Sequence, residues 1–70
     1  EMFQVGDKVT RKGSKVWEIA TVAKAGDVFD SQLAILGAGG PDAIVYQLKD
    51  PATGKVAKNV RWSESDLTAV

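Results

Sequence analysis

The segment from residue 43 to residue 62 restricts the fold more than any other part of the chain. It reads AIVYQLKD, then PATG, then KVAKNVRW. The two outer stretches alternate apolar and polar residues, as half-buried β-strands do. Pro51 presets the backbone for a turn, and Gly54 can adopt the left-handed conformation that closes it. We therefore predict a β-hairpin with strands at 43–50 and 55–62.

The N-terminal third predicts a second hairpin, with strands at 7–12 and 16–24. The sequence KGSK between them is typical of a turn, in which Gly13 is expected to take a positive φ. Val5 and Val9 are expected to face the core. The strand at 16–24 carries apolar side chains on both faces, so its periodicity leaves open which face is buried. Residues 63–66 predict one 3₁₀ turn, and residues 67–70 a short closing strand.

Residues 25–42 interrupt this series of strands. The segment is long for a connection between strands and is rich in apolar residues. Asp30 or Ser31 is placed to cap a short helix, and the sequence GAGGP from residue 37 is placed to end it. Three interpretations stay open. The insertion covers one open end of the barrel, it meets a partner protein or a second copy of the chain, or it gates a ligand.

Composition limits the chemistry that the chain can perform. Its 70 residues are enough for one domain, which we place at residues 2–70. The chain contains no cysteine and no histidine, which excludes disulfides, thiolate metal sites and Ser-His or Cys-His nucleophiles within it. The paired acids Glu64 with Asp66 and Asp27 with Asp30 lie in predicted turns, where carboxylates usually cap or face solvent. We predict no enzymatic activity, no cofactor and no metal.

The charges balance, with nine basic and nine acidic residues, so no global field attracts nucleic acid or an anionic membrane. The longest apolar run falls far short of the roughly 18 residues of a membrane-spanning helix. We expect a soluble cytoplasmic protein that does not bind membranes.

Seven of the nine positive charges cluster in two stretches of the predicted hairpins, residues 8–15 and residues 55–61. If the hairpins share a face, these residues would form a local basic stripe for nucleic acid, with Trp17, Tyr46 or Trp62 available to stack on bases or under an arginine. Lysines also commonly solvate exposed strands and discourage edge pairing, which is the other interpretation. The candidate nucleic-acid contacts are Lys12, Lys15, Lys58 and Arg61.

The apolar insertion and the aromatic residues supply a different set of candidates. Aromatic side chains in a small barrel usually pack in the core or at its rim, but an aromatic groove can also grip a peptide. The candidate contacts to a protein partner are Phe29, Leu33, Leu36, Trp17, Tyr46 and Trp62.

The order of predicted elements resembles the SH3-like five-stranded barrels over nearly the whole chain, with a long, partly helical insertion between strands two and three. The opening VGDKV, residues 5–9, resembles the start of many bacterial members, including KOW and Tudor-type modules. Residues 6–9, Trp17 and the pair Asp66-Leu67 also resemble the plasmid-encoded type II dihydrofolate reductases. That family contacts its pterin and nicotinamide through a Val-Gln-Ile-Tyr strand, where this chain has NVRW at 59–62, without the glutamine and the tyrosine.

These observations predict an all-β, SH3-like barrel that acts as a non-enzymatic interaction module. It is expected to bind a protein partner or its own copies through the insertion and the aromatic rim. The first alternative is nucleic-acid binding through the basic hairpins. The second is a degenerate oligomer of the type II reductase kind.

Overall fold

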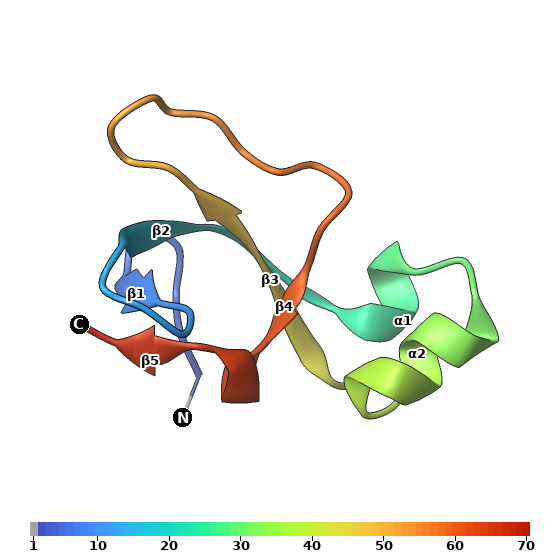
Figure 1. Cartoon of the computed structure of the whole chain (residues 1–70). Helices are drawn as coiled ribbons and strands as arrows, with labels where there is room; N and C mark the ends of the chain where they lie inside the picture. Colours follow the sequence, from blue (N-terminus) through green and yellow to red (C-terminus); the bar gives the residue numbers. More distant parts are fainter. Residues whose placement is uncertain (1) are drawn as a thin grey trace.

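The computed structural model describes residues 2–70, which form a curled antiparallel sheet with two short helices at one end (Figure 1). The strands are β1 (Lys8–Thr10), β2 (Val16–Lys24), β3 (Ile44–Lys49), β4 (Trp62–Ser63) and β5 (Thr68–Ala69). The helices are α1 (Ala25–Val28) and α2 (Gln32–Ala38), and a 3₁₀ turn, η1 (Glu64–Asp66), separates β4 from β5. The strand order is β4-β3-β2-β1-β5, and all neighbours are antiparallel. The prediction of a small, mostly β fold is confirmed.

The main core lies on one face of this sheet and draws on residues from nearly the full length of the chain. Val9 is fully buried there, as predicted, whereas Val5 is exposed. Removal of these apolar side chains from water supplies most of the drive to fold. The core residues are Phe3, Val9, Ile19, Tyr46, Leu48 and Leu67, with Trp17, Val22, Ile44 and Trp62 packed against them.

A β-bulge in β2 explains why its periodicity is ambiguous. Ile19 pairs with Leu48 and Thr21 with Gln47, which leaves Ala20 as an extra residue. An extra residue reverses the alternation of side chains beyond it. The core therefore receives Ile19 before the bulge and Val22 after it.

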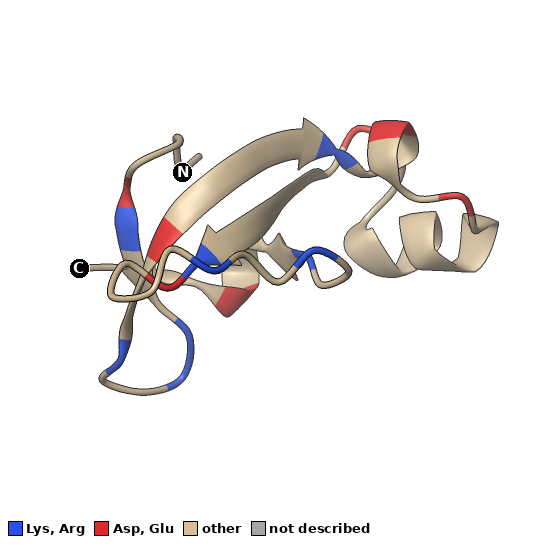
Figure 2. Ribbon diagram, turned by 90° about the horizontal axis from the view of Figure 1, so that it is seen from above, with Lys and Arg blue, Asp and Glu red and all other residues tan. Residues whose placement is uncertain are grey.

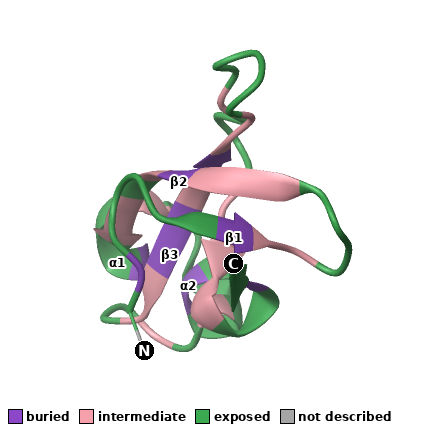
Figure 3. Ribbon diagram, turned by 90° about the vertical axis from the view of Figure 1, so that its left-hand side faces the viewer, coloured by how far each residue is buried: buried purple, intermediate pink, exposed green. Residues whose placement is uncertain are grey.

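Strand β3 has buried residues on both of its faces (Figure 3). Tyr46 and Leu48 point into the main core, as the alternation predicts. Val45, on the opposite face, is nevertheless only 2% exposed. It borders a cavity whose other lining residues include Phe29 and Ala38, so the helical segment covers this side of the strand.

The helical segment is closely fastened to the end of the sheet. The Ser31 hydroxyl accepts a hydrogen bond from the Ala34 N–H at 3.4 Å and caps α2, and Gly39 ends the helix with a φ of 109°. Of the two predicted capping residues, Ser31 is the one used. The Gly26 N–H donates to the Pro41 carbonyl at 2.9 Å, and a Cβ on Gly26 would lie 3.0 Å from Pro41, so the chain approaches itself as closely as a glycine permits.

The predicted strand at 55–62 is wrong over most of its length. Val56 makes one isolated bridge with Lys49, and regular pairing resumes only where Trp62 lies opposite Tyr46. Between these two pairs β3 advances three residues and the returning chain six, so the surplus residues leave the sheet. The Gln47 side chain takes the place of the missing ladder contact, because its Nε2 donates to the Lys58 carbonyl at 2.8 Å.

The smaller turn predictions have mixed outcomes. Gly54 has a φ of 75°, as predicted, and its N–H donates to the Asp50 carbonyl at 2.7 Å. In the β1–β2 loop the positive φ belongs to Lys12, at 51°, and Gly13 does not need one. The predicted 3₁₀ turn is present, and the Ser63 N–H and hydroxyl both donate to Asp66 Oδ2.

Candidate functional site

An arginine lies between the two tryptophans of the chain. The guanidinium carbon of Arg11 is 4.4 Å from the ring centroid of Trp17 and 4.6 Å from that of Trp62. Trp17 lies on β2 opposite Val9, and Trp62 lies on β4 opposite Tyr46, so both indoles reach the rim of the core. We call Arg11, Trp17 and Trp62 the arginine stack. Cation–π contact with two indoles restricts the position of the guanidinium.

Lys15, from the β1–β2 loop, contacts the arginine stack at Trp17. Lys15 Nζ lies 4.5 Å from the Trp17 ring centroid and forms a 2.9 Å ion pair with Asp50 Oδ2. The hydrogen bond from Lys15, followed by one from the Ala52 N–H, lowers the pKa of Asp50. This contact joins the β1–β2 loop to the turn after β3.

Two hollows that differ in size and polarity border the arginine stack. The first, of about 250 Å³, is open and is lined by Arg11, Lys12, Trp62 and Asp66. The second is a smaller slot of about 80 Å³ with a mostly apolar lining. The residues that line the slot are Arg11, Trp17, Leu48, Ala57, Val60 and Trp62. Arg11 and Trp62 border both.

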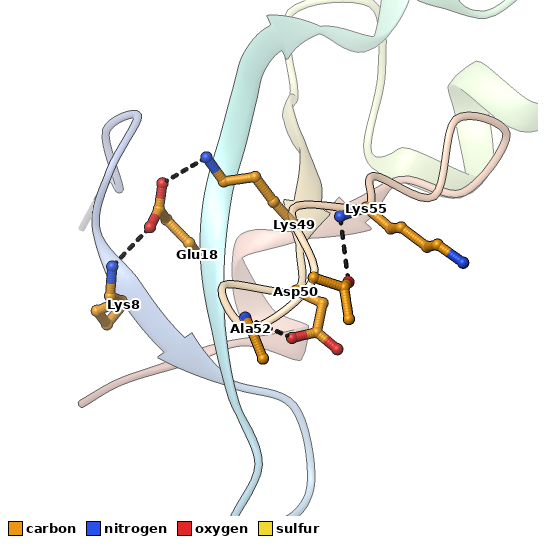
Figure 4. Close-up of polar contacts among 7 residues, drawn as sticks. Lys8, Glu18, Lys49, Asp50, Ala52 and Lys55 are labelled. Carbon is orange, nitrogen blue, oxygen red and sulfur yellow. Dashed lines mark hydrogen bonds and ion pairs between the residues drawn. The ribbon is translucent and has the colours of Figure 1, made fainter.

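Two other cations on the sheet share one carboxylate. Glu18 on β2 bridges Lys8 at 2.6 Å and Lys49 at 3.0 Å (Figure 4). The hydrogen bond from Lys8, followed by that from Lys49, lowers the pKa of the Glu18 carboxyl. These lysines therefore stabilise the exposed face of the sheet and are not available as a free basic stripe.

The four candidate nucleic-acid contacts lie in different surroundings. Lys12 is exposed beside the arginine stack, whereas Lys15 is paired with Asp50. Lys58 lies on the segment that leaves the sheet, and its side chain is exposed. Arg61 is half-buried, lines the cavity that Phe29 borders, and has an enclosed Nη1 with no partner in residues 2–70. Figure 2 shows cations both on the β1–β2 loop and on the chain after β3.

The candidate contacts of the insertion divide in the same way. Phe29 is half-buried against the helical cavity, and Ile35 of α2 is buried. Leu33 is 80% exposed and Leu36 is 69% exposed. They are three residues apart on α2 and so lie on one side of the helix. Figure 3 shows most of α2 in the colour of exposed residues.

Tyr46 is the one aromatic candidate that the structure removes from the surface, because it is fully buried. Its hydroxyl accepts a hydrogen bond from the Phe3 N–H at 3.1 Å and donates to the Glu64 carboxylate. Burial, followed by the charge of Glu64, raises the pKa of Tyr46, since the Phe3 hydrogen bond only partly compensates. Tyr46 acts as a structural anchor between the N-terminal segment and η1.

Arg11 is the functional candidate that sequence reasoning did not select. The sequence shows it as one cation in a basic hairpin, and its place between two tryptophans depends on how β4 returns to the sheet. Within residues 2–70 no group of three or more acidic side chains is arranged to hold a metal ion. The described chain also has no helix of the length and apolarity needed to cross a membrane.

Searches with family models, among curated proteins and among solved structures find no significant match to this chain.

Proposed function

We propose that the chain is an SH3-like barrel with a partly helical insertion that acts as a non-enzymatic interaction module. Its five antiparallel strands, with one 3₁₀ turn before the last, are compatible with that barrel class. The module binds a protein partner or a second copy of itself through α2 and the aromatic rim.

The exposed pair Leu33 and Leu36 carries this proposal. Both side chains stand in water on a helix that is capped at Ser31 and held by the buried Ile35, so the helix presents them in a fixed arrangement. Burial of a leucine side chain contributes about 1.5–3 kcal/mol. Because these two leucines are exposed in the free chain, a partner that covers them gains this free energy on binding. Aliphatic residues displayed together on a rigid element are typical of a protein-binding surface.

The first test measures self-association. Wild-type protein and the double variant Leu33→Ser/Leu36→Ser are compared by sedimentation velocity over a range of concentrations. We expect the wild type to form an oligomer that the variant loses, with unchanged circular dichroism. Met2→Ser/Val5→Ser is the matched control, because it removes two other exposed apolar side chains and should leave the oligomer intact.

Two results distinguish the remaining cases. A wild type that stays monomeric at high concentration removes self-association, and the same variants then test binding to a protein partner. Unfolding of the α2 variant would show that the two leucines support the fold, and the interaction proposal would fail.

A further inference from the structure

Within residues 2–70, the guanidinium of Arg11 in the arginine stack has hydrogen-bond donors without acceptors. A guanidinium carries five N–H donors in a fixed plane. In residues 2–70 Arg11 forms no ion pair or hydrogen bond, and its nitrogens are not among the enclosed polar atoms. The two indole rings restrict the position of the guanidinium, and Arg11 borders the open hollow. Such a fork is preorganised for a planar, two-oxygen anion.

The charge around the hollow favours a monoanion. Arg11 and Lys12 contribute two positive charges, and Asp66 contributes one negative charge. Asp66 Oδ2 is occupied by the Ser63 N–H and hydroxyl, so this carboxylate is held in η1 and does not reach the fork. A single carboxylate on Arg11 matches the remaining positive charge, whereas the closely spaced charges of a nucleic-acid backbone exceed it.

The apolar slot adds a second requirement. Arg11 borders this slot as well, and its walls include Leu48, Val60 and Ala57. With about 80 Å³ it has room for a group of a few carbon atoms. A ligand that fills both hollows therefore carries a carboxylate and a small aliphatic group close together. The C-terminal residue of a peptide has this arrangement, because its carboxylate and its side chain leave the same carbon atom.

We infer that the arginine stack binds the free C-terminus of a partner peptide that ends in a small aliphatic residue. Arg11 receives the carboxylate through its fork, Lys12 adds charge, and the apolar slot beside the stack takes the side chain. This inference rests on the proposed role as an interaction module and assigns a partner chemistry to its aromatic rim. It does not involve α2, so the two surfaces can be tested separately.

The test uses tryptophan fluorescence, because both tryptophans of the chain belong to the stack. The probe is an acetylated Gly-Ser peptide that ends in valine with a free carboxylate, and its C-terminal amide is the matched control. We expect the acid to bind with a Kd of about 0.1–1 mM, as suits a short ligand, and the amide to bind at least about tenfold more weakly. The indole N–H signals in NMR spectra should shift with the acid only.

Two further ligands separate the possible sources of the anion. One is an amidated peptide with an internal glutamate beside a valine, and the other is a short oligothymidine. Both should bind more weakly than the free C-terminus. Equal binding of the acid and the amide, or stronger binding of either other ligand, would overturn the inference. Tighter binding of the oligothymidine would instead support the nucleic-acid alternative.

Two single variants test whether peptide binding depends on Arg11. Arg11→Lys keeps the charge and removes the fork, and should weaken acid binding by about fivefold or more. Lys55→Gln, which removes an exposed cation outside both hollows, should leave binding within about twofold. An unaffected Arg11→Lys variant would overturn the inference. If Leu33→Ser/Leu36→Ser loses the oligomer but still binds the peptide, the two proposals stand independently. If the peptide fails to bind wild type while the oligomer persists, this inference alone fails.

Discussion

Replacement of the buried hydroxyl in Tyr46→Phe should destabilise the fold by about 1–3 kcal/mol. The change leaves the side-chain volume almost intact but removes the acceptor of the Phe3 N–H. Phe3 is itself buried, so its N–H finds no water in place of the phenol. An unsatisfied buried donor costs about 1–3 kcal/mol, and the hydrogen bond to Glu64 is lost as well. In a domain of this size, a loss of about 2 kcal/mol lowers Tm by roughly 8–16 °C.

Thermal and urea unfolding measure this loss, and alkaline titration supplies an independent readout. Tyr46 is the only tyrosine of the chain, so phenolate absorbance reports on this residue alone. Its pKa is raised in the folded state, mainly by burial. The hydroxyl therefore stabilises the fold fully below pH of about 10, and this stabilisation is lost as the pH rises through the raised pKa. The wild type should lose stability at high pH more steeply than Tyr46→Phe.

Glu64→Gln is the matched variant, since it removes the charge near the phenol and retains an acceptor. Phenolate should then form at lower pH than in the wild type. If Tyr46→Phe melts at the wild-type temperature, the Phe3 N–H has another acceptor and the reasoning from burial is refuted.

Three other substitutions test local features. Gly54→Val forces a β-branched residue to a φ of 75° and should cost about 1 kcal/mol or more; an unchanged urea midpoint would contradict the turn. Gly37→Ala places a methyl in open space on α2 and should stabilise the protein by about 0.5–1 kcal/mol, whereas a lower midpoint would mean that the helix is differently packed. Hydrogen bonds from Lys8, then Lys49, lower the Glu18 pKa, so their stabilisation is present above pH of about 4.5 and is lost as the pH falls through the lowered value. Glu18→Gln should therefore show a smaller drop in Tm between pH 7 and pH 3 than the wild type, and parallel curves would refute this.

Local chemistry made several elements predictable from the sequence. Ser31 caps α2, Gly54 adopts the left-handed conformation, and β2 occupies residues 16–24 as predicted. Each depends on residues close together in the chain. Val45 shows the limit of such patterns, because alternation assigns it to the face opposite the main core, and only the return of the helical segment buries it.

The candidate site was less predictable because it depends on register. A strand at 55–62 satisfies the alternation rule, but the rule carries no information on how many residues separate two paired positions. Here the pairing slips between Val56 and Trp62, and this slip decides where Trp62 meets Arg11. A sequence can show that a chain holds an arginine and two tryptophans, but their stacking is set by contacts some fifty residues apart.

The surplus segment between Val56 and Trp62 can change the binding slot without changing the paired strands on either side of it. Both of its ends are fixed by pairing with β3, and the residues between them contribute Ala57 and Val60 to the wall of the slot. Insertions, deletions or randomised residues here would change the size and polarity of the slot while the hydrogen-bonded ladder keeps its register. The same scaffold is therefore suited to a library in which only this segment varies, selected against peptides that differ in their last side chain.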